Sequence, residues 1–301
     1  MRSAGRLRIL EAVPLAKLGW LVHGFSTRPG GASKIPSADA AQSRGGAKAR
    51  ADVLNLGYTD WDSPAHVAKN RKQFFHALRA DGFRPVTLRQ IHSDAALRAD
   101  LQPDSAGDPP SGDALFTCRP GFLLAVQTAD CVPILLADTK QRAIAAVHAG
   151  WRGTLRRIAE KTIGRMRMEF GTRPEDVIAA LGPGIGRCCY EVGSEVAREF
   201  HARFPHAREW FDGPFDALAA GESDPNWLPW LTMKPPGHAP PSPRVHLDLI
   251  AANRAILGEA GVPVRQIFCS DYCTACRTDL FFSYRREHQT GRAIAAIGLL
   301  P

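Results

Sequence analysis

The sequence lacks the features that would place a protein in a membrane or on nucleic acid. No segment of the 301 residues approaches the roughly 20 consecutive apolar residues that a membrane-spanning helix needs. Near the start, Glu11, Pro14 and Lys17 interrupt the apolar run, so we expect no signal peptide. Dense Lys/Arg runs with interleaved aromatic residues are also missing. We therefore expect a cytoplasmic protein with no membrane partner and no nucleic-acid partner.

Cysteine is scarce and odd in number. Seven cysteines in 301 residues do not resemble the dense disulfide scaffold of a small secreted domain, so we expect reduced thiols. Lys and Arg exceed Asp and Glu by 38 to 30, which gives a formal net charge of +8. Such a mildly basic protein suits a small anionic ligand such as phosphate, although a plain soluble surface has the same charge balance.

Apolar patterning predicts more strands than clear helices. The runs over residues 122–131, 133–138 and 143–150 are too continuous for half-exposed strands and predict a buried sheet. Helices are predicted over 63–82 and 154–171, the first with Ser63 as its N-cap. Because strands and helices do not alternate strictly, we expect an α+β fold, with residues 1–301 in one domain. A Pro-, Gly- and Trp-rich stretch at 205–244 is expected to form a long ordered excursion or lid.

Three residues with metal-binding side chains each end a predicted strand, namely His92, Cys131 and His148. Catalytic zinc uses three protein ligands of these types and keeps one position for water or substrate. Three strand ends at one edge of a sheet can converge on one point, so a three-ligand zinc site is one interpretation. The alternative is a buried cysteine with two ordinary histidines.

Charged neighbours accompany these residues. Asp130 and Asp94 lie beside ligand candidates, where a carboxylate can orient an imidazole or accept a proton. Arg152 follows His148 in a Gly-bounded turn that leads into a helix N-terminus, which suits an anion. A plain surface arginine is an equally good interpretation of Arg152.

A second group of cysteines consists of adjacent Cys188 and Cys189 together with the Cys-x-x-Cys pair Cys273 and Cys276. The pattern allows a four-thiolate zinc site, a redox or disulfide role, or inert thiols that line a core or pocket. Adjacent cysteines are an unusual half of a zinc site, so the sequence favours inert thiols.

Several motifs, met in order along the chain, resemble those of the YfiH-like family. This family was first called laccase-domain or multicopper polyphenol oxidase, and is now described as purine nucleoside phosphorylases with adenosine deaminase activity. The motifs are HGFSTRPGG (23–31), RQIHSD (89–94), GDALFT (112–117), TADCVPILLAD (128–138), VHAGWRG (147–153), GPGIGRCCYEVG (182–193) and CTAC with the FFSYRRE that follows (273–287). The loops at 31–52 and 205–244 are longer than the family pattern and could reshape the mouth of the pocket. Substrate preference is therefore the family property that carries over least directly to this sequence.

The resemblance implies a single compact α+β domain with stacked mixed β-sheets flanked by helices, related to cysteine hydrolases. It implies that His92, Cys131 and His148 hold Zn²⁺, with copper less suitable because multicopper chemistry needs more histidines at paired spacing. The implied substrates are phosphate with adenosine or inosine, and S-methyl-5′-thioadenosine as a further candidate. A monomer or homodimer is expected, and some relatives are implicated in peptidoglycan editing.

Within that chemistry we expect specific roles for the remaining residues. Arg28 and Arg152 are candidates to bind phosphate, and Asn55 is a candidate to hold a ribose hydroxyl or the base. Asp130 or Asp94 would transfer protons when zinc-activated water attacks adenine. The rival functions are a polyphenol oxidase, a hydrolase of amide bonds in peptidoglycan precursors with a Cys131–His148 pair, and a non-catalytic partner protein.

Overall fold

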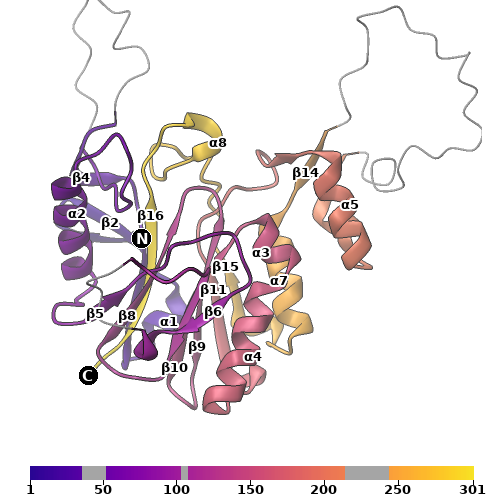
Figure 1. The fold of residues 1–301 in the computed structure, drawn as a ribbon, viewed down its shortest axis with the longest axis horizontal. Helices are drawn as coiled ribbons and strands as arrows, with labels where there is room; N and C mark the ends of the chain where they lie inside the picture. Colours follow the sequence, from indigo (N-terminus) through magenta and orange to yellow (C-terminus); the bar gives the residue numbers. More distant parts are fainter. Residues whose placement is uncertain (36–51, 103–107, 214–243) are drawn as a thin grey trace, which may run out of the picture.

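The computed structural model describes residues 1–35, 52–102, 108–213 and 244–301. Figure 1 shows two β-sheets side by side in the middle of the molecule, with α2 outside one sheet and α3, α4 and α7 outside the other. Among the described residues, no helix is long and apolar enough to cross a bilayer.

The first sheet has six strands in the order β1-β2-β3-β16-β8-β5. All neighbours are antiparallel except the parallel pair of β5 and β8 at one edge. The strands are β1 (Arg2–Ala4), β2 (Leu7–Leu10), β3 (Leu21–Ser26), β5 (Arg84–Val86), β8 (Phe122–Thr128) and β16 (Ala293–Leu299). The short helix α1 (Val13–Ala16) lies between β2 and β3 in sequence, and β4 (Pro29–Ser33) follows β3.

The second sheet also has six strands, in the order β15-β11-β9-β10-β7-β6. Its centre is antiparallel, and the outer pairs β11–β15 and β6–β7 are parallel. The strands are β6 (Ala96–Arg98), β7 (Ala114–Thr117), β9 (Val132–Asp138), β10 (Ala143–Ala149), β11 (Val177–Leu181) and β15 (Ile267–Cys269).

Both faces of the central strands are buried, which explains their unbroken apolar sequences. In β9, Leu135 and Ala137 belong to the core between the two sheets. The alternate residues Ile134 and Leu136 belong to the core between the second sheet and its helices. Because a strand places successive side chains on opposite faces, burial on both faces requires apolar residues at every position. The predicted buried sheet is confirmed.

Helices cover the outer faces of both sheets. Helix α2 (Pro64–Ala77) packs Phe74 against the first sheet, and the Ser63 hydroxyl caps it by accepting a hydrogen bond from the His66 N–H. The other helices are α3 (Trp151–Leu155), α4 (Ile158–Phe170), α5 (Ser194–Arg203), α7 (Leu249–Glu259) and α8 (Tyr284–Glu287). The helix predicted over 154–171 is therefore two helices, α3 and α4, and it ends as expected at Gly171 in a left-handed conformation (φ +74°).

The stretch that was expected to be an excursion contributes one strand, β13, to a small three-stranded sheet. This sheet consists of β12 (Glu191–Val192), β14 (Val245–Leu247) and β13 (Phe211–Asp212). Trp210 and Phe211 are buried and belong to the core on the helix side of the second sheet. Residues 205–213 are thus part of the main body, and 214–243 lie outside the described residues.

Strands β8 and β9 are joined by one of the short connections between the two large sheets. Strand β8 ends at Thr128 in the first sheet, and β9 begins at Val132 in the second. We call residues 129–131 the crossover turn. The fold is a single α+β domain, as predicted, and the crossover turn carries Asp130 and Cys131.

Candidate metal centre and substrate cavity

Three potential metal ligands converge beside the crossover turn. One ligand atom each from His92, Cys131 and His148 lies within 4.8 Å of the other two. The Cys131 Sγ is 3.9 Å from the His92 Nε2, and the two imidazole rings meet edge to face with their centroids 5.0 Å apart. Pairing of Val132 with Ala149 brings Cys131 and His148 to the same edge of the second sheet.

His92 lies in a loop and not, as predicted, at the end of a strand. The predicted strand is wrong beyond Val86, where β5 ends. His92 instead lies in the loop between β5 and β6, with a left-handed backbone (φ +57°) that non-glycine residues adopt rarely. Gly150 gives it room, because a Cβ at that position would lie 3.0 Å from both the Cys131 Sγ and the His92 Cδ2.

The fully buried Asp113 holds the whole arrangement. Its Oδ1 accepts hydrogen bonds from the backbone N–H of His92 (3.0 Å) and from the Nδ1 of His148 (2.9 Å). Its Oδ2 accepts from the N–H groups of Ile91 (3.2 Å) and Ser93 (2.6 Å) and from the Ser93 hydroxyl (2.7 Å). One carboxylate therefore fixes the left-handed loop and directs the His148 Nε2 toward Cys131. Sequence reasoning missed this residue, whose only signal was its place in the GDALFT motif.

These contacts shift three pKa values. Burial alone would raise the pKa of Cys131, but the His148 and His92 imidazoles outweigh it and lower the pKa to about 6. Burial disfavours a charged His148, yet the Cys131 thiolate and Asp113 raise its pKa to about 9. Burial would also raise the pKa of Asp113, but hydrogen bonds from His148 and Ser93 lower it to about 2. The metal-free site is therefore a thiolate–imidazolium pair supported by a carboxylate.

The donor set fits a metal ion of the zinc type. A thiolate and two imidazoles are zinc ligands, and three protein ligands leave one position open. The carboxylate on the far nitrogen of His148 is the usual way in which a protein orients a metal-binding imidazole. The same donors also suit copper, so the ligand set alone does not select the metal.

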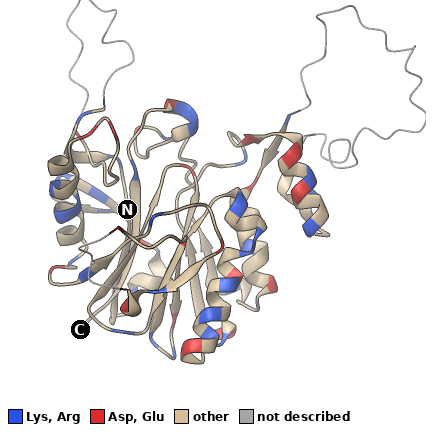
Figure 2. Ribbon diagram, viewed as in Figure 1, with Lys and Arg blue, Asp and Glu red and all other residues tan. Residues whose placement is uncertain are grey.

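The three residues line one wall of a cavity of about 690 Å³, a size typical of small-molecule sites. Four arginines border it, and its one acidic lining residue is Asp130. Figure 2 shows α8 largely in blue, because this helix carries Arg285 and Arg286. The lining residues are Leu88, Arg89, Gln90, His92, Gln127, Thr128, Ala129, Asp130, Cys131, His148, Trp151, Arg152, Ile185, Tyr190, Tyr284, Arg285 and Arg292. A cavity of this charge and aromatic content suits an anion together with a flat ring.

Asp130 is held firmly at the cavity wall. Its backbone is left-handed (φ +92°) and its side chain is buried. The Thr274 hydroxyl donates a hydrogen bond to Oδ1 and the Arg285 N–H donates one to Oδ2, both at 2.7 Å. The carboxylate therefore links the crossover turn to the C-terminal segments that form the opposite wall.

Asp94 lies elsewhere, which corrects its expected role. It lines a separate hollow with Arg156, Arg157 and Lys161, and its carboxylate is paired with the Lys161 ammonium. That hydrogen bond is the main cause of its lowered pKa. Of the two candidate carboxylates, the structure places Asp130 alone at the cavity.

Arg28 and Asn55 have structural partners rather than a place at the cavity. The Arg28 guanidinium donates to Glu287 (2.7 Å) and to the Thr278 carbonyl (3.0 Å), so it ties the turn after β3 to the C-terminal region. Asn55 is fully buried, with its amide donating to Asp62 at 2.8 Å and its Oδ1 accepting from the Arg292 N–H at 2.9 Å. Neither residue is among those that line the cavity.

The arginines that line the cavity include three that sequence reasoning missed, namely Arg89, Arg285 and Arg292. Arg152 is exposed at the start of α3, with its guanidinium stacked over the Trp151 ring at 4.3 Å. The guanidinium groups of Arg285 and Arg292 lie near the rings of Tyr190 and Tyr284 respectively. Burial lowers the pKa of Arg292. Arg285 lies in the FFSYRRE segment and Arg89 in RQIHSD, and both segments were noted for their resemblance and not for their charge.

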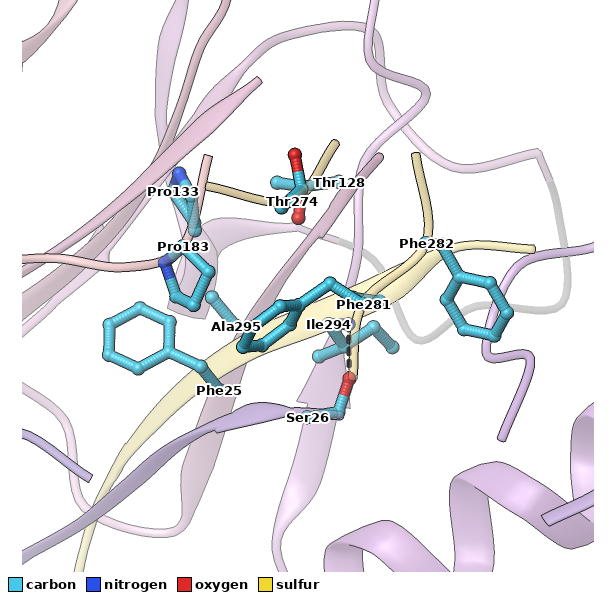
Figure 3. A pocket seen from close by; sticks show the side chains of 11 residues that line it. Phe25, Ser26, Thr128, Pro133, Pro183, Thr274, Phe281, Phe282, Ile294 and Ala295 are labelled. Carbon is cyan, nitrogen blue, oxygen red and sulfur yellow. Dashed lines mark hydrogen bonds between the residues drawn. The ribbon is translucent and has the colours of Figure 1, made fainter. Parts of the chain in front are cut away.

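A much smaller cavity shares the lining residue Thr128 with the first and is too small for a substrate. Figure 3 shows Phe25, Phe281 and Ile294 around it, with the Ile294 N–H donating to the Ser26 hydroxyl at 2.9 Å. Its volume is about 10 Å³, near the minimum for a single water molecule, so we interpret it as a packing gap.

Comparison with known proteins identifies the family. Residues 22–300 match the family described as multi-copper polyphenol oxidoreductase laccase. The chain belongs to this family. A relative named purine nucleoside phosphorylase, from Deinococcus radiodurans, is 38% identical over 300 residues, which cover 99% of this chain and 95% of that protein. The purine nucleoside phosphorylase YfiH of Escherichia coli is 34% identical over 249 residues, or 83% of this chain and 87% of its own.

Solved structures of family members have the same fold. The crystal structure of YlmD from Geobacillus stearothermophilus has a TM-score of 0.76 and 30% identity, and the match covers 100% of this chain and 98% of that one. The Bacillus licheniformis protein YfiH has a TM-score of 0.77 and 28% identity, with 99% and 97% covered. The predicted family and fold class are confirmed.

Proposed function

We propose that the chain is a zinc-dependent purine nucleoside phosphorylase with adenosine deaminase activity. The observation that carries the proposal is the position of the His92–Cys131–His148 trio on the wall of an arginine-bordered cavity of nucleoside size. The names of the relatives support the phosphorylase part of the proposal. Adenosine and inosine are the proposed nucleosides, with S-methyl-5′-thioadenosine as a further substrate.

In phosphorolysis, a phosphate oxygen bonds to the ribose C1′ while the bond from C1′ to the purine nitrogen breaks. The purine leaves with a proton on a ring nitrogen. Arg152, Arg285 and Arg292 would bind the phosphate, because guanidinium groups stay charged and donate to two oxygens at once. The rings of Trp151 and Tyr190 are placed to pack against the base.

In deamination, a water oxygen adds to C6 of adenine and the amino group leaves as ammonia. Zinc bound by the trio would supply activation of that water, since such ions lower the pKa of a bound water toward about 7. Asp130 would accept and return the protons, and its oxygens accept hydrogen bonds from the Thr274 hydroxyl and the Arg285 N–H.

The donor inventory argues against multicopper oxidase chemistry. Within the described ranges, the groups of three or more His, Cys, Asp or Glu side chains close enough to share a metal are this trio and one set of four cysteines. Neither provides the several paired histidines of a multinuclear copper centre. Zinc therefore remains the proposed metal.

A cysteine hydrolase is the second candidate, and a specific observation favours it. The His148 imidazole lies between the Asp113 carboxylate and the Cys131 thiol, the order of carboxylate, base and nucleophile in a catalytic triad. Amide bonds of peptidoglycan precursors would be its substrates. A thiolate that holds zinc is a poor free nucleophile, so metal content separates the two functions.

The test is an assay of purified protein with adenosine and inosine, each with and without phosphate, alongside elemental analysis. We expect zinc in the protein, ribose 1-phosphate and free base in the presence of phosphate, and inosine from adenosine in its absence. The Cys131→Ala variant should lose both turnover and the metal of this site. Full turnover in a zinc-free protein, or copper with oxidation of phenols, would refute the proposal.

A further inference from the structure

A second cluster of potential metal ligands lies apart from the catalytic trio. The sulfur atoms of Cys188, Cys189, Cys273 and Cys276 all lie within 4.8 Å of one another. They come from the segments that follow β11 and β15, which are parallel neighbours and so end at the same edge of the second sheet. An isolated bridge between Gly184 and Cys273 continues this pairing beyond the strands.

We propose that these four cysteines bind a zinc ion of their own, with a structural role. The Cys276 Sγ is 3.5 Å from the Cys188 Sγ and 3.4 Å from the Cys189 Sγ. Those separations are close to roughly 3.8 Å, the edge of a tetrahedron of sulfurs placed about 2.3 Å from a central zinc. They are far longer than the bond of about 2.0 Å in a disulfide.

Two of the four cysteines are more exposed than inert core thiols usually are. Cys188 and Cys276 are exposed, whereas an inert cysteine is usually a small buried apolar residue. Cys118 and Cys269, in contrast, pack against the main core. The explanation as inert core thiols therefore fits the latter pair and not the cluster.

Donors around the cluster match those around a metal-bound thiolate. The Gly186 N–H donates to the Cys273 Sγ at 3.2 Å, and the Arg286 guanidinium lies 3.7 Å from the Cys189 Sγ. Arg286 also donates to the Ala275 carbonyl at 3.2 Å, which holds the Cys-x-x-Cys turn. Its positive charge offsets part of the net negative charge of a four-thiolate zinc site.

A redox role fits less well. A Cys-x-x-Cys redox pair usually lies at a helix N-terminus, where the helix dipole lowers a thiol pKa. Cys273 and Cys276 lie in a turn after β15.

The proposed ion would fasten two pieces of the cavity wall. Ile185 and Tyr190, which flank the first cysteine pair, line the cavity. Beside the second pair, Thr274 donates its N–H to the Gly184 carbonyl at 3.0 Å and its hydroxyl to Asp130. The four-cysteine zinc thus holds Thr274 where it orients Asp130, although the ion contacts no substrate.

The test is zinc content by mass spectrometry of the metal in full-length protein purified under reducing conditions. We expect about two zinc ions per chain in the wild type, about one in Cys131→Ala, and about one in Cys273→Ser/Cys276→Ser. The matched control Cys118→Ser/Cys269→Ser, which removes two cysteines outside the cluster, should keep both. The two sites lose zinc through different variants, so failure of one assignment is distinguishable from failure of the other.

The Cys131→Ala variant tests the cluster without changing any of its four cysteines, so the test does not require a cluster variant that folds. Loaded with cobalt(II), it should show the intense visible absorption of tetrahedral thiolate coordination. A Cys131→Ala protein that holds no metal and whose four cluster thiols react freely with a thiol reagent would overturn the proposal. So would a disulfide within the cluster, detected as a mass loss of two hydrogens in protein prepared with reductant and zinc.

Discussion

Replacement of Asp113 by Asn should weaken metal binding more than its small change in shape implies. The Asn side chain would put an NH₂ group where Asp113 now has one of its two oxygens. At the Oδ1 position, this NH₂ group would face the N–H donors of His92 and His148. At the Oδ2 position, it would face the N–H donors of Ile91 and Ser93. A buried donor without an acceptor costs about 1–3 kcal/mol, so we expect the free energy of unfolding to fall by about 2–6 kcal/mol. Loss of such a metal-orienting carboxylate typically lowers affinity roughly 10–100-fold, or about 1.4–2.8 kcal/mol.

The assay is competition for zinc with a chromophoric chelator at pH 7, paired with denaturant unfolding of the metal-free protein. Asp138→Asn is the matched control, because Asp138 is also fully buried but lies at the far end of β9. Its Oδ1 accepts two backbone N–H groups, so an Asn side chain can keep both bonds. Zinc affinity of Asp113→Asn within about twofold of wild type would refute the positioning role.

Asp113 also makes the stability of the fold depend on pH in the acid range. The pKa of Asp113 is lowered to about 2, below the unfolded value of about 3.9. Its contribution to stability is therefore fully present above the unfolded pKa and is lost as the pH falls through 2. Asp113→Asn should remove that part of the acid dependence.

Three further predictions concern the cavity and its ligands. Arg152→Ala should raise the phosphate KM severalfold with little change in zinc content, because its guanidinium borders the cavity. Arg28→Ala should instead lower the free energy of unfolding by about 1–3 kcal/mol and leave the phosphate KM unchanged, since Arg28 bonds Glu287 and Thr278. In the metal-free protein, alkylation of Cys131 by iodoacetamide should increase with pH through a midpoint at about 6, where the thiolate forms.

Each prediction has a control and a contrary outcome. If Arg28→Ala shifts the phosphate KM as much as Arg152→Ala does, the structural role of Arg28 is wrong. For the thiol, the same peptide in denaturant should titrate near the ordinary value of about 8.5. An equal midpoint in folded protein would contradict the pairing of Cys131 with His148. The thiolate's contribution to stability is lost as the pH falls through 6, and that of the imidazolium is lost as it rises through 9.

The sequence predicted the parts of the structure that depend on local pattern. Strands β8, β9 and β10 were predictable because burial on both faces leaves an unbroken apolar run. The proposed ligands Cys131 and His148 were identified by their place at the ends of those runs, and the structure brings their side chains together. The helix over α2 was predictable from Ser63, whose hydroxyl caps its first turn.

The parts that failed depend on contacts between distant residues. Arg28 and Asn55 lie in turn-rich motifs that suit ligand binding, but their partners Glu287 and Arg292 are 259 and 237 positions away. No local sequence pattern indicates that those side chains are hydrogen-bonded to such distant residues. His92 likewise depends on Asp113, 21 residues later, to hold its left-handed backbone.

The crossover turn makes the site sensitive to the packing between the two sheets. Three residues connect β8 to β9, and they include both the proposed metal ligand Cys131 and the carboxylate of Asp130 at the cavity wall. A small slide or rotation of one sheet against the other would therefore move this turn. We expect substitutions in the core between the sheets, such as at Leu135 or Ile144, to displace Asp130 and Cys131. The proposed activity should consequently depend on how the two sheets pack together, even for changes that leave every cavity residue intact.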